Sequence, residues 1–402
     1  MRPGRTSRRR SGCGLTTFAP LRRSPAVDRL RHVLGRLDWV LVLGVAAITV
    51  FGLRMVEVAT RDDIPGDAKF FAFRQLIYVA VGVGVMSIAM AIDLERLGRR
   101  PWTLWGALCG AVTVVLIIGS AARGSRRWID FGVFQFQPSE IGKVAMIVIL
   151  AGLIVERRNE IGTARLSLLA LGATALPAFI VFLQPDLGSS LVYVAILAGI
   201  LFFAGVPWKH FAVAAAAVVG LAVLVLTILP AVGVPLLRDY QVNRLQSFVD
   251  SSKDPVGTGF QADQSRIATG HGGAFGRGVD GATQVGNDLL PEHHTDFIFA
   301  SEAEMFGFVG AALLILAFGL VIWRALRIMT RASTQFDQLV AGGIAAMFAF
   351  QVFVNIGMNV TIMPITGIPL PFMSYGGSHT LTNLIAVGIL LRIHRTRGKG
   401  PL

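Results

Sequence analysis

Residues 290–297 read LPEHHTDF and close a long polar segment that begins at Pro235 and lies between two hydrophobic runs. Its aromatic and aliphatic residues alternate with charged ones, a pattern typical of a loop that packs on itself rather than of a linker. Its many glycines permit close backbone approach to a ligand or to a neighbouring helix. Long insertions in compact proteins are usually functional or disordered. Since this composition favours function, we expect residues 235–297 to carry most of the chemistry.

The rest of the chain is too apolar for a soluble protein of 402 residues, because 53% of the residues are hydrophobic and only 15% are charged. A membrane-spanning helix needs about 20 consecutive apolar residues, and about ten such runs can be counted. We therefore predict an all-α, polytopic integral membrane protein, with the long loop between spans seven and eight. The runs are 38–56, 75–92, 102–120, 138–155, 164–183, 187–205, 210–233, 298–323, 337–362 and 369–391.

The basic residues indicate how the chain is oriented. The formal net charge is +13, and the basic clusters fall on the tails and on alternate connections between spans. Under the positive-inside rule both termini lie in the cytoplasm and the long loop faces outward. The first tail is expected to be disordered and attracted to anionic lipids, and the distribution of charge argues against nucleic acid as a partner. The predicted parts are a basic tail at 1–36, spans one to seven at 37–234, the outer loop at 235–297, spans eight to ten at 298–392 and a basic tail at 393–402.

The fourth hydrophobic run begins with two helix-starting residues and contains two ionisable ones. Pro138 and Ser139 are typical of the first turn of a helix. Glu140 and Lys143 are three residues apart, so they lie on one helical face and can form an ion pair. This pair is either a structural contact near the outer boundary or the polar floor of an external cavity, because ionisable residues within a span are costly and usually mark a site. The sequence leaves both interpretations open.

Other polar features also lie near the outer ends of the spans. Asp186, in the short QPDLG connection, is interpreted as the cap of the next helix in preference to a ligand. Asn355 lies near the outer end of the ninth run. From Pro364 onward several prolines interrupt regular helix before FMSYGGS at 372–378. Since irregular backbone at membrane depth must be buried in protein or line a cavity, we expect a broken segment beside the site.

Seven stretches resemble the RodA/FtsW family of bacterial cell-wall polymerases, the shape, elongation, division and sporulation family. They are RW at 127–128, FQPSEIGK at 136–143, QPDLG at 184–188, Arg244, the glycine-rich residues 264–278, LPEHHTDFIF at 290–299 and PITGIPLPFMSYGGS at 364–378. The resemblance covers roughly Asp38 to Arg392, and motifs of this length in this order are highly specific. GRGVDGATQ at 276–284, with its spacer before LPE, is more similar to the RodA, or elongation, branch than to the FtsW branch.

The resemblance implies a peptidoglycan glycosyltransferase that polymerises lipid II on the outer leaflet, with Asp296 as the family's essential aspartate. Asp296 would act as general base, and no second carboxyl is needed because pyrophosphate leaves without protonation. The substrate-binding positions that we assign are Arg127, Trp128, Glu140, Lys143, Arg244, Gln264, Arg277, Glu292, Ser374 and Ser378. The positions that shape the cavity are Pro138, Asp186, Asn355, Gly376 and Gly377.

The departing pyrophosphate must be neutralised by cations. Arg127, Arg244 and Lys143 are the expected ones, and a divalent cation, Mg²⁺ or Mn²⁺, is an alternative. By analogy the resemblance also implies partners: lipid II, a class B penicillin-binding protein with transpeptidase activity, and membrane proteins of the elongation complex. The expected location is the bacterial cytoplasmic membrane.

Two positions depart from the family's pattern. Glu304 is followed by Met305, where paired acidic residues are usual. His379 follows Ser378, where a second small hydroxyl residue is usual. Both departures affect the surroundings expected for the site and leave Asp296 unchanged.

Other classes of function compete with this interpretation. One is a transporter that flips lipid II across the bilayer, although the polar residues concentrate at the outer side and no internal repeat suggests alternating access. Its path would be lined by Glu140, Lys143, Asp186 and Asn355. Another is a non-catalytic scaffold for a transpeptidase. The simplest structural alternative for Asp296 is a cap of the eighth span.

Overall fold

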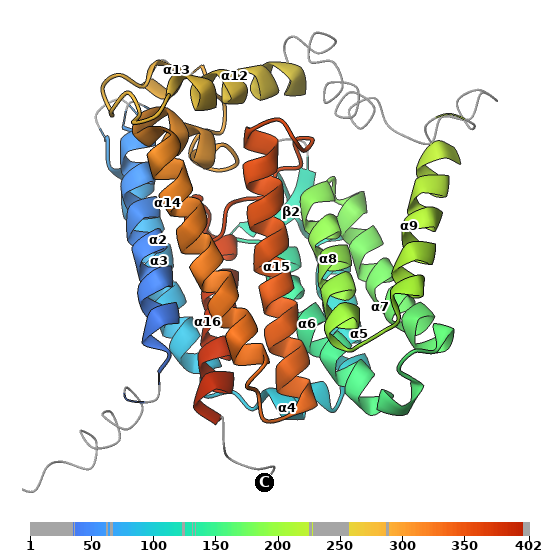
Figure 1. Ribbon diagram of the computed structural model, residues 1–402. Coiled ribbons are helices and arrows are strands. Elements are labelled where there is room, and N and C mark those ends of the chain that lie inside the picture. Colours follow the sequence, from blue (N-terminus) through green and yellow to red (C-terminus); the bar gives the residue numbers. More distant parts are fainter. Residues whose placement is uncertain are drawn as a thin grey trace, which may run out of the picture. The chain divides into compact units, whose positions relative to one another are not determined.

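The structure is a computed structural model, and it describes most of the unit that begins at Asp38 (Figure 1). The described residues are 35, 37–61, 63–64, 67–122, 125–130, 132, 134–224, 227, 257–286 and 289–396. Most of the first basic tail, residues 228–256 at the end of the seventh run and in the outer loop, and residues 397–402 lie outside this set. The predictions for those parts, including the role of Arg244, stay predictions.

A helix lies at every hydrophobic run that the sequence predicts. These helices are α2 (Trp39–Ala59), α3 (Phe70–Ala89), α5 (Pro101–Ile118), α6 (Pro138–Glu156), α7 (Ala164–Leu183), α8 (Leu187–Phe203), α9 (Trp208–Val223), α14 (Ile298–Met329), α15 (Gln335–Asn359) and α16 (Gly377–Thr396). Among the described residues, α2, α3, α6, α7, α14 and α15 are long and apolar enough to cross a membrane, and α5, α8 and α9 are shorter apolar helices. The all-α architecture of a multi-pass membrane protein is confirmed.

The remaining elements are short. α4 (Leu94–Gly98) and the 3-10 helix η1 (Arg158–Glu160) lie in connections, and α12 (Thr258–His271) and α13 (Thr283–Gly286) belong to the outer loop. The strands β1 (Ser120–Ala122), β2 (Ser125–Asp130) and β3 (Gln135–Phe136) form an antiparallel sheet in the order β1-β2-β3 between α5 and α6. The sequence predicts only a loop there, because β1 and β3 are too short to display an alternating pattern and β2, SRRWID, does not alternate.

α6 and α15 form the buried centre of the bundle. Most residues of both helices are buried, whereas few of those of α3 are. α15 packs against α6, α8 and α14, and it stands between α8 and α14 in Figure 1. Small residues permit this packing: a Cβ added at Gly199 of α8 would lie 2.3 Å from the Cβ of Ala346. The polar ends of these helices are therefore held on a tightly packed support.

α14 is broken at Gly307, whose φ of 68° is not helical. The glycine-rich part of the outer loop bonds to the backbone groups on both sides of the break. Arg277 N–H donates to the carbonyl of Glu304 at 3.0 Å, and Phe308 N–H donates to that of Gly273 at 2.9 Å. The glycines thus allow a close approach to a neighbouring helix, one of the two alternatives that the sequence leaves open.

The tenth hydrophobic run becomes helical later than its pattern suggests. The run begins at residue 369, but α16 begins at Gly377, and residues 363–376 form no helix. Side chains of this segment are nevertheless buried, and Leu370, Met373 and Ser374 are fully so. The expected irregular segment, buried in protein at the end of a span, is confirmed.

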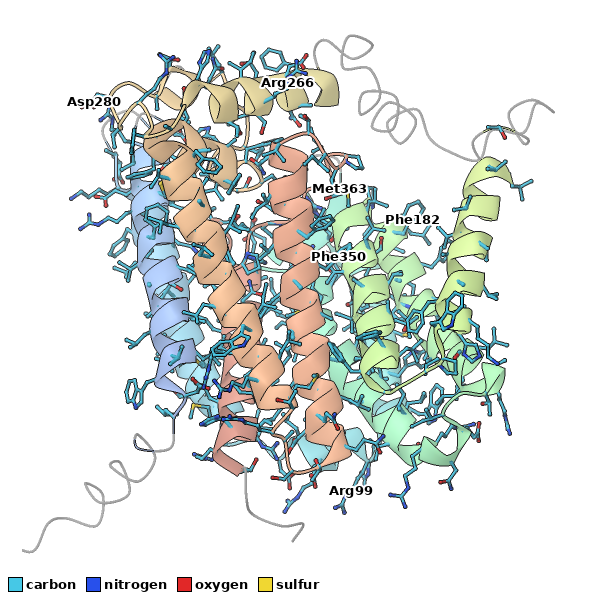
Figure 2. The ribbon with its side chains drawn as sticks, in the orientation of Figure 1. Arg99, Phe182, Arg266, Asp280, Phe350 and Met363 are labelled. Carbon is cyan, nitrogen blue, oxygen red and sulfur yellow. The ribbon has the colours of Figure 1, made fainter. Side chains whose placement is uncertain are left out.

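Loops that the charge pattern assigns to opposite sides lie at opposite ends of the bundle. Figure 2 shows Arg99, from the connection after α4, far from Arg266 and Asp280 of the outer loop. The separation agrees with a bundle whose alternate connections face alternate sides of the bilayer.

A methyl group at Gly276 should separate the outer loop from α14. Gly276 has a φ of 82°, and an added Cβ would lie 2.1 Å from the carbonyl oxygen of Met305. We expect Gly276→Ala to reduce the free energy of unfolding by about 2–4 kcal/mol, because a backbone clash adds to the cost of the left-handed conformation. The control is Gly270→Ala, in α12, where the added Cβ meets nothing within 4 Å. Equal thermal unfolding temperatures for the two variants in detergent would contradict this packing.

Candidate active site

A cavity of about 820 Å³ lies among the polar ends of the spans. Its wall comes from the first turns of α3, α6, α8 and α16, the β2–β3 sheet, the loop containing Asp296 and the irregular segment before α16. The lining residues are Phe71, Arg74, Tyr78, Arg127, Trp128, Gln135, Gln137, Glu140, Pro185, Asp186, Ser189, Glu292, His294, Thr295, Asp296, Thr366, Gly367, Pro369, Tyr375, Gly376, Gly377, Ser378 and His379. Each of these parts lies where the sequence predicts an outward-facing end.

Asp296 is held on the cavity wall through its backbone. The side-chain amides of Asn355 and Asn359, on successive turns of α15, donate to its carbonyl oxygen at 3.0 and 3.1 Å. The amide oxygen of Asn359 accepts from the N–H of Ala300 at 3.0 Å, which fixes the first turn of α14. The carboxylate itself faces the irregular segment, since a Cβ added at Gly367 would lie 3.4 Å from Asp296 Oδ2. Asn355 therefore holds the backbone of a lining residue, although it does not itself line the cavity.

The irregular segment before α16 is bonded to the loop that carries Asp296. The hydroxyl of Ser374 donates to the carbonyl of Thr295 at 2.6 Å and accepts from the N–H of Leu370 at 2.8 Å. The N–H of Tyr375 donates to the carbonyl of His294 at 3.0 Å. Ser374 is fully buried and outside the cavity wall, and its predicted contact with substrate stays a prediction. The hydroxyl instead forms hydrogen bonds with backbone groups that have no partner within a helix.

The ion pair predicted in the fourth span is present at the cavity floor. Lys143 Nζ donates to Glu140 Oε1 at 2.5 Å, and His379 Nδ1 lies 3.5 Å from Glu140 Oε2. Glu140 lines the cavity, whereas Lys143 is 1% exposed and does not. The ammonium group of Lys143 is directed at Glu140, and the predicted contact of Lys143 with the substrate stays a prediction. His379, noted as a departure from the family's pattern, completes this buried cluster.

Asp186 serves both as a helix cap and as part of the cavity wall. Its Oδ1 accepts from the N–H of Ser189 at 3.0 Å, which confirms the predicted cap of α8. Its Oδ2 accepts from the side chain of Gln137 at 2.7 Å, and Arg127 Nη1 lies 3.8 Å from Oδ1. The guanidinium of Arg127 also lies 4.2 Å from the ring centre of Trp128. Arg127 is thereby held at the cavity by an acid and an aromatic ring.

Ser378 connects the first turn of α16 to the small sheet. Its hydroxyl accepts from the N–H of Gln137 at 2.9 Å and donates to the carbonyl of Gln135 at 2.8 Å. Gly376 and Gly377 lie beside it on the wall, and a Cβ at Gly377 would lie 2.7 Å from the ring of Phe134. These three predicted positions are therefore brought together at the cavity.

Three other predicted site residues lie away from the cavity wall. Gln264 is half-buried in α12, and the exposed Arg277 donates from its Nε to the carbonyl of His271 at 2.8 Å. Neither side chain lines the cavity, and both predicted substrate contacts stay predictions. Pro138 begins α6, as the sequence predicts.

The sequence analysis missed one face of the cavity, which α3 provides. Phe71, Arg74 and Tyr78 all line the cavity, and their spacing of three and four residues places them on one side of the helix. That spacing, with an arginine at the predicted outer end of a span, was the available signal. His294 and Gln137, inside recognised motifs, were also missed as lining residues.

The Glu140–Lys143 pair should show strong energetic coupling. Lys143→Met leaves the Glu140 carboxylate buried without its ammonium partner, which typically costs about 3–5 kcal/mol of unfolding free energy. The double variant Glu140→Gln/Lys143→Met should recover much of that loss, because no uncompensated charge remains. Thermal unfolding of the purified single and double variants measures the coupling. Additive losses would show that the two groups do not depend on each other.

Comparison with known proteins identifies the family. The family model of the FtsW, RodA and SpoVE proteins, described as cell cycle protein, matches residues 36–399. Stage V sporulation protein E of Bacillus subtilis is 38% identical over 369 residues, which cover 89% of this chain and 97% of that protein. Peptidoglycan glycosyltransferase MrdB of Escherichia coli is 34% identical over 366 residues, which cover 90% and 94%.

Solved structures share the same fold. The crystal structure of the rod shape determining protein RodA of Thermus thermophilus matches with a TM-score of 0.66 at 28% identity, over 90% of this chain and 98% of that one. A chain from a structure described as "Structural coordination of polymerization and crosslinking by a peptidoglycan synthase complex" matches with a TM-score of 0.77 at 30% identity, over 90% and 99%. In sequence and in fold, this chain belongs to the FtsW/RodA/SpoVE family of cell cycle proteins.

Proposed function

We propose that this chain is a peptidoglycan glycosyltransferase that polymerises lipid II in the 820 Å³ cavity. The observation that carries the proposal is that Asp296 lies on the wall of this cavity together with Arg74 and Arg127. A carboxylate can accept the proton of an attacking hydroxyl, and guanidinium groups match phosphate oxygens in charge and geometry. A relative that is named a peptidoglycan glycosyltransferase supports the same activity.

In the proposed reaction Asp296 accepts the proton of the acceptor's GlcNAc 4-hydroxyl. The oxygen attacks the anomeric carbon of the donor's MurNAc, the bond to the undecaprenyl pyrophosphate breaks, and the α linkage becomes β. General-base assistance of this kind contributes about 10²–10⁴-fold in rate. A single carboxylate suffices, because pyrophosphate leaves without the protonation that an alcohol leaving group requires.

Arg127 and Arg74 are the cationic groups best placed to meet the leaving pyrophosphate. Lys143, expected for this role, lies 2.5 Å from Glu140 and off the cavity wall. A divalent cation, Mg²⁺ or Mn²⁺, prefers oxygen ligands, and the carboxylates of Glu292 and Asp296 on the cavity wall are the groups that would hold it. Such an ion would neutralise charge that develops on the phosphate oxygens.

The proposed orientation places the cavity on the outer face of the bacterial cytoplasmic membrane and both termini in the cytoplasm. Arg99, from a basic cluster, lies at the end of the bundle opposite Arg266 and Asp280 of the outer loop (Figure 2). Lipid II presented on the outer leaflet would then reach Asp296 without crossing the bilayer.

A class B penicillin-binding protein, membrane proteins of the elongation complex and anionic lipids are the proposed partners. The similar chain from a peptidoglycan synthase complex, described by its polymerisation and crosslinking, supports a transpeptidase partner. We favour the elongation role of the RodA branch over the septal role of the FtsW branch. The spacer before residue 290 supports this assignment.

The flipping of lipid II is less well supported. Of the residues expected to line a transport path, Lys143 and Asn355 are buried and outside the cavity wall. Liposomes with lipid II on the leaflet that the cavity faces separate the two activities, because a transporter alone produces no polymer. A scaffold without activity would also leave lipid II unpolymerised.

Asp296→Asn should reduce lipid II polymerisation by about 10²–10⁴-fold without changing the thermal unfolding temperature, because an amide cannot accept the proton but has the same shape. The assay uses purified full-length protein with its cognate transpeptidase, and it is repeated after chelation. The matched control is Asp263→Asn, an acid-to-amide change on α12 outside the cavity wall. Polymerisation at the native rate by the Asp296 variant would refute the general-base role.

A further inference from the structure

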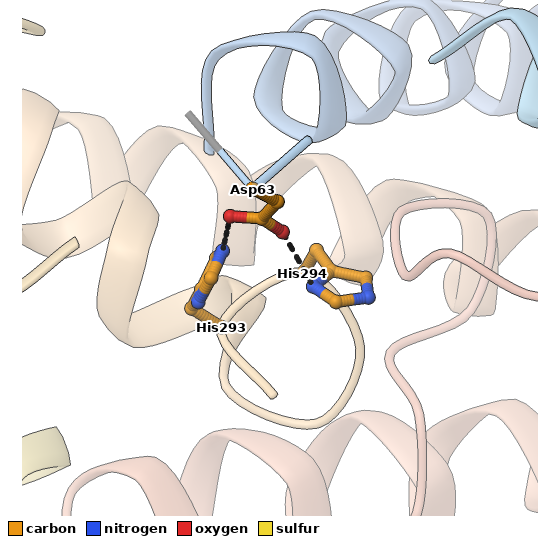
Figure 3. Close-up of side chains that lie close together, drawn as sticks. All are labelled: Asp63, His293 and His294. Atoms are coloured by element: carbon orange, nitrogen blue, oxygen red, sulfur yellow. Dashed lines mark ion pairs between the residues drawn. The ribbon is translucent and has the colours of Figure 1, made fainter. Parts of the chain in front are cut away.

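Three metal-ligating side chains meet beside the loop that carries Asp296. Asp63 comes from the connection between α2 and α3, and His293 and His294 come from the LPEHHTDF motif (Figure 3). His293 Nε2 lies 3.4 Å from Asp63 Oδ1, and His294 Nδ1 lies 3.9 Å from Asp63 Oδ2. One ligand atom from each residue lies within 4.8 Å of the other two. Among the described residues no other group of three such side chains is this close.

The hydrogen bond on the far side of His293 determines which ring nitrogen faces the acid. His293 Nδ1 lies 2.9 Å from the carbonyl oxygen of Leu290, which can only accept, so Nδ1 is the donor. In the neutral imidazole Nε2 then presents its lone pair to Asp63. A lone pair and a carboxylate repel each other, so either a proton or a metal ion lies between them. Metal-ligating histidines have this arrangement, with the second ring nitrogen bonded to a backbone carbonyl or an acid.

The three ligand atoms are close enough to gather around a small tetrahedral ion. Metal–ligand bonds of about 2.0–2.1 Å place neighbouring ligands about 3.3–3.4 Å apart. His293 Nε2 lies at this separation from Asp63 Oδ1, whereas His294 Nδ1 lies 3.9 Å from the other oxygen, Oδ2, so the side chains must draw together before two nitrogens and one oxygen share an ion. Asp63 also lines a second cavity of about 120 Å³. Arg61 lines it too, but its guanidinium bonds to Asp280 at 3.1 Å.

We propose that Asp63, His293 and His294 bind a divalent transition-metal ion of the Zn²⁺ class, with water as the fourth ligand. Two imidazole nitrogens and one carboxylate oxygen suit Zn²⁺, whereas Mg²⁺ prefers oxygen ligands alone. The site is thus distinct from any cation that binds the pyrophosphate.

The bound ion would fasten the loop of Asp296 to the connection after α2. His294 contacts both the proposed metal site and the large cavity, whose wall it helps to form. Its ring centre lies 5.0 Å from that of Phe71 and 5.6 Å from that of Tyr375. Its carbonyl accepts from the N–H of Tyr375, which follows Ser374 in the irregular segment. A metal at this point therefore acts by positioning, because it restrains the backbone two residues before Asp296.

The test measures metal binding to the full-length chain, purified with an affinity tag that contains no histidine and stripped with a chelator. Titration with Co²⁺ should give the visible absorption of a tetrahedral site, saturating at one ion per chain, and added Zn²⁺ should displace it. Zn²⁺ should also raise the thermal unfolding temperature. Asp63→Asn and His293→Ala should each weaken binding by more than about 10-fold.

Two controls keep the result interpretable. His271→Ala removes an exposed histidine at the end of α12 and should bind the ion as the wild type does. His293 is buried and its variant can fail to fold, whereas Asp63 lies in a partly exposed connection and keeps its shape as asparagine. Two results would overturn the proposal: no stoichiometric binding by the wild type, or binding of native strength by the folded Asp63 variant. The contact between His293 and Asp63 would then be an ordinary hydrogen bond through a proton. Lipid II polymerisation is not the readout, so failure here and failure of the glycosyltransferase assignment are separate results.

Discussion

The structure around Asp296 depends on two buried amides that bind one carbonyl oxygen. Asn355 and Asn359 have no exposed surface, and both donate to the backbone of Asp296. A buried amide without partners would cost about 1–3 kcal/mol, so this network has one arrangement that satisfies it. Asn359 also accepts from α14 and, through its own carbonyl, from Ser265 of α12 at 2.9 Å. The amides therefore fix the outer loop, the eighth span and the acid to α15 at one point.

This network matters because the cavity is built from backbone that is not helical. In a bilayer, irregular segments persist only where protein or water satisfies their polar groups. Backbone groups beside the break in α14 at Gly307 form hydrogen bonds with the glycine-rich part of the outer loop. Those of the segment before α16 form hydrogen bonds with Ser374 and with the loop of Asp296. α15 packs against both α6 and α14, and α6 packs against α16. A polar cavity can therefore exist at the ends of apolar helices without loss of the bundle.

Hydropathy predicted the helices because each span must form its backbone hydrogen bonds within itself. Helical spacing predicted the Glu140–Lys143 pair, and the place of Asp186 before a helix predicted the cap. The sequence pattern alone could not show that Lys143 faces Glu140 and not the cavity. Nor could it show that the hydroxyl of Ser374 forms hydrogen bonds with backbone groups. Nor could it predict that the start of α3 completes the wall, since Arg74 and Asp296 are brought together only by tertiary packing. Motif recognition marked the right loops, and the structure determined which side chains in them reach the cavity.

The central claim is that the side chain of Asp296 lies on an outward-facing polar cavity. It is tested most directly by Asp296→Cys in a chain whose Cys13 and Cys109 are replaced by serine, treated in intact spheroplasts with a small, charged, membrane-impermeant thiol reagent. The account predicts modification from outside the membrane, as for the exposed control Asp280→Cys. Modification only after the membrane is permeabilised, or only after the protein is denatured, would contradict it.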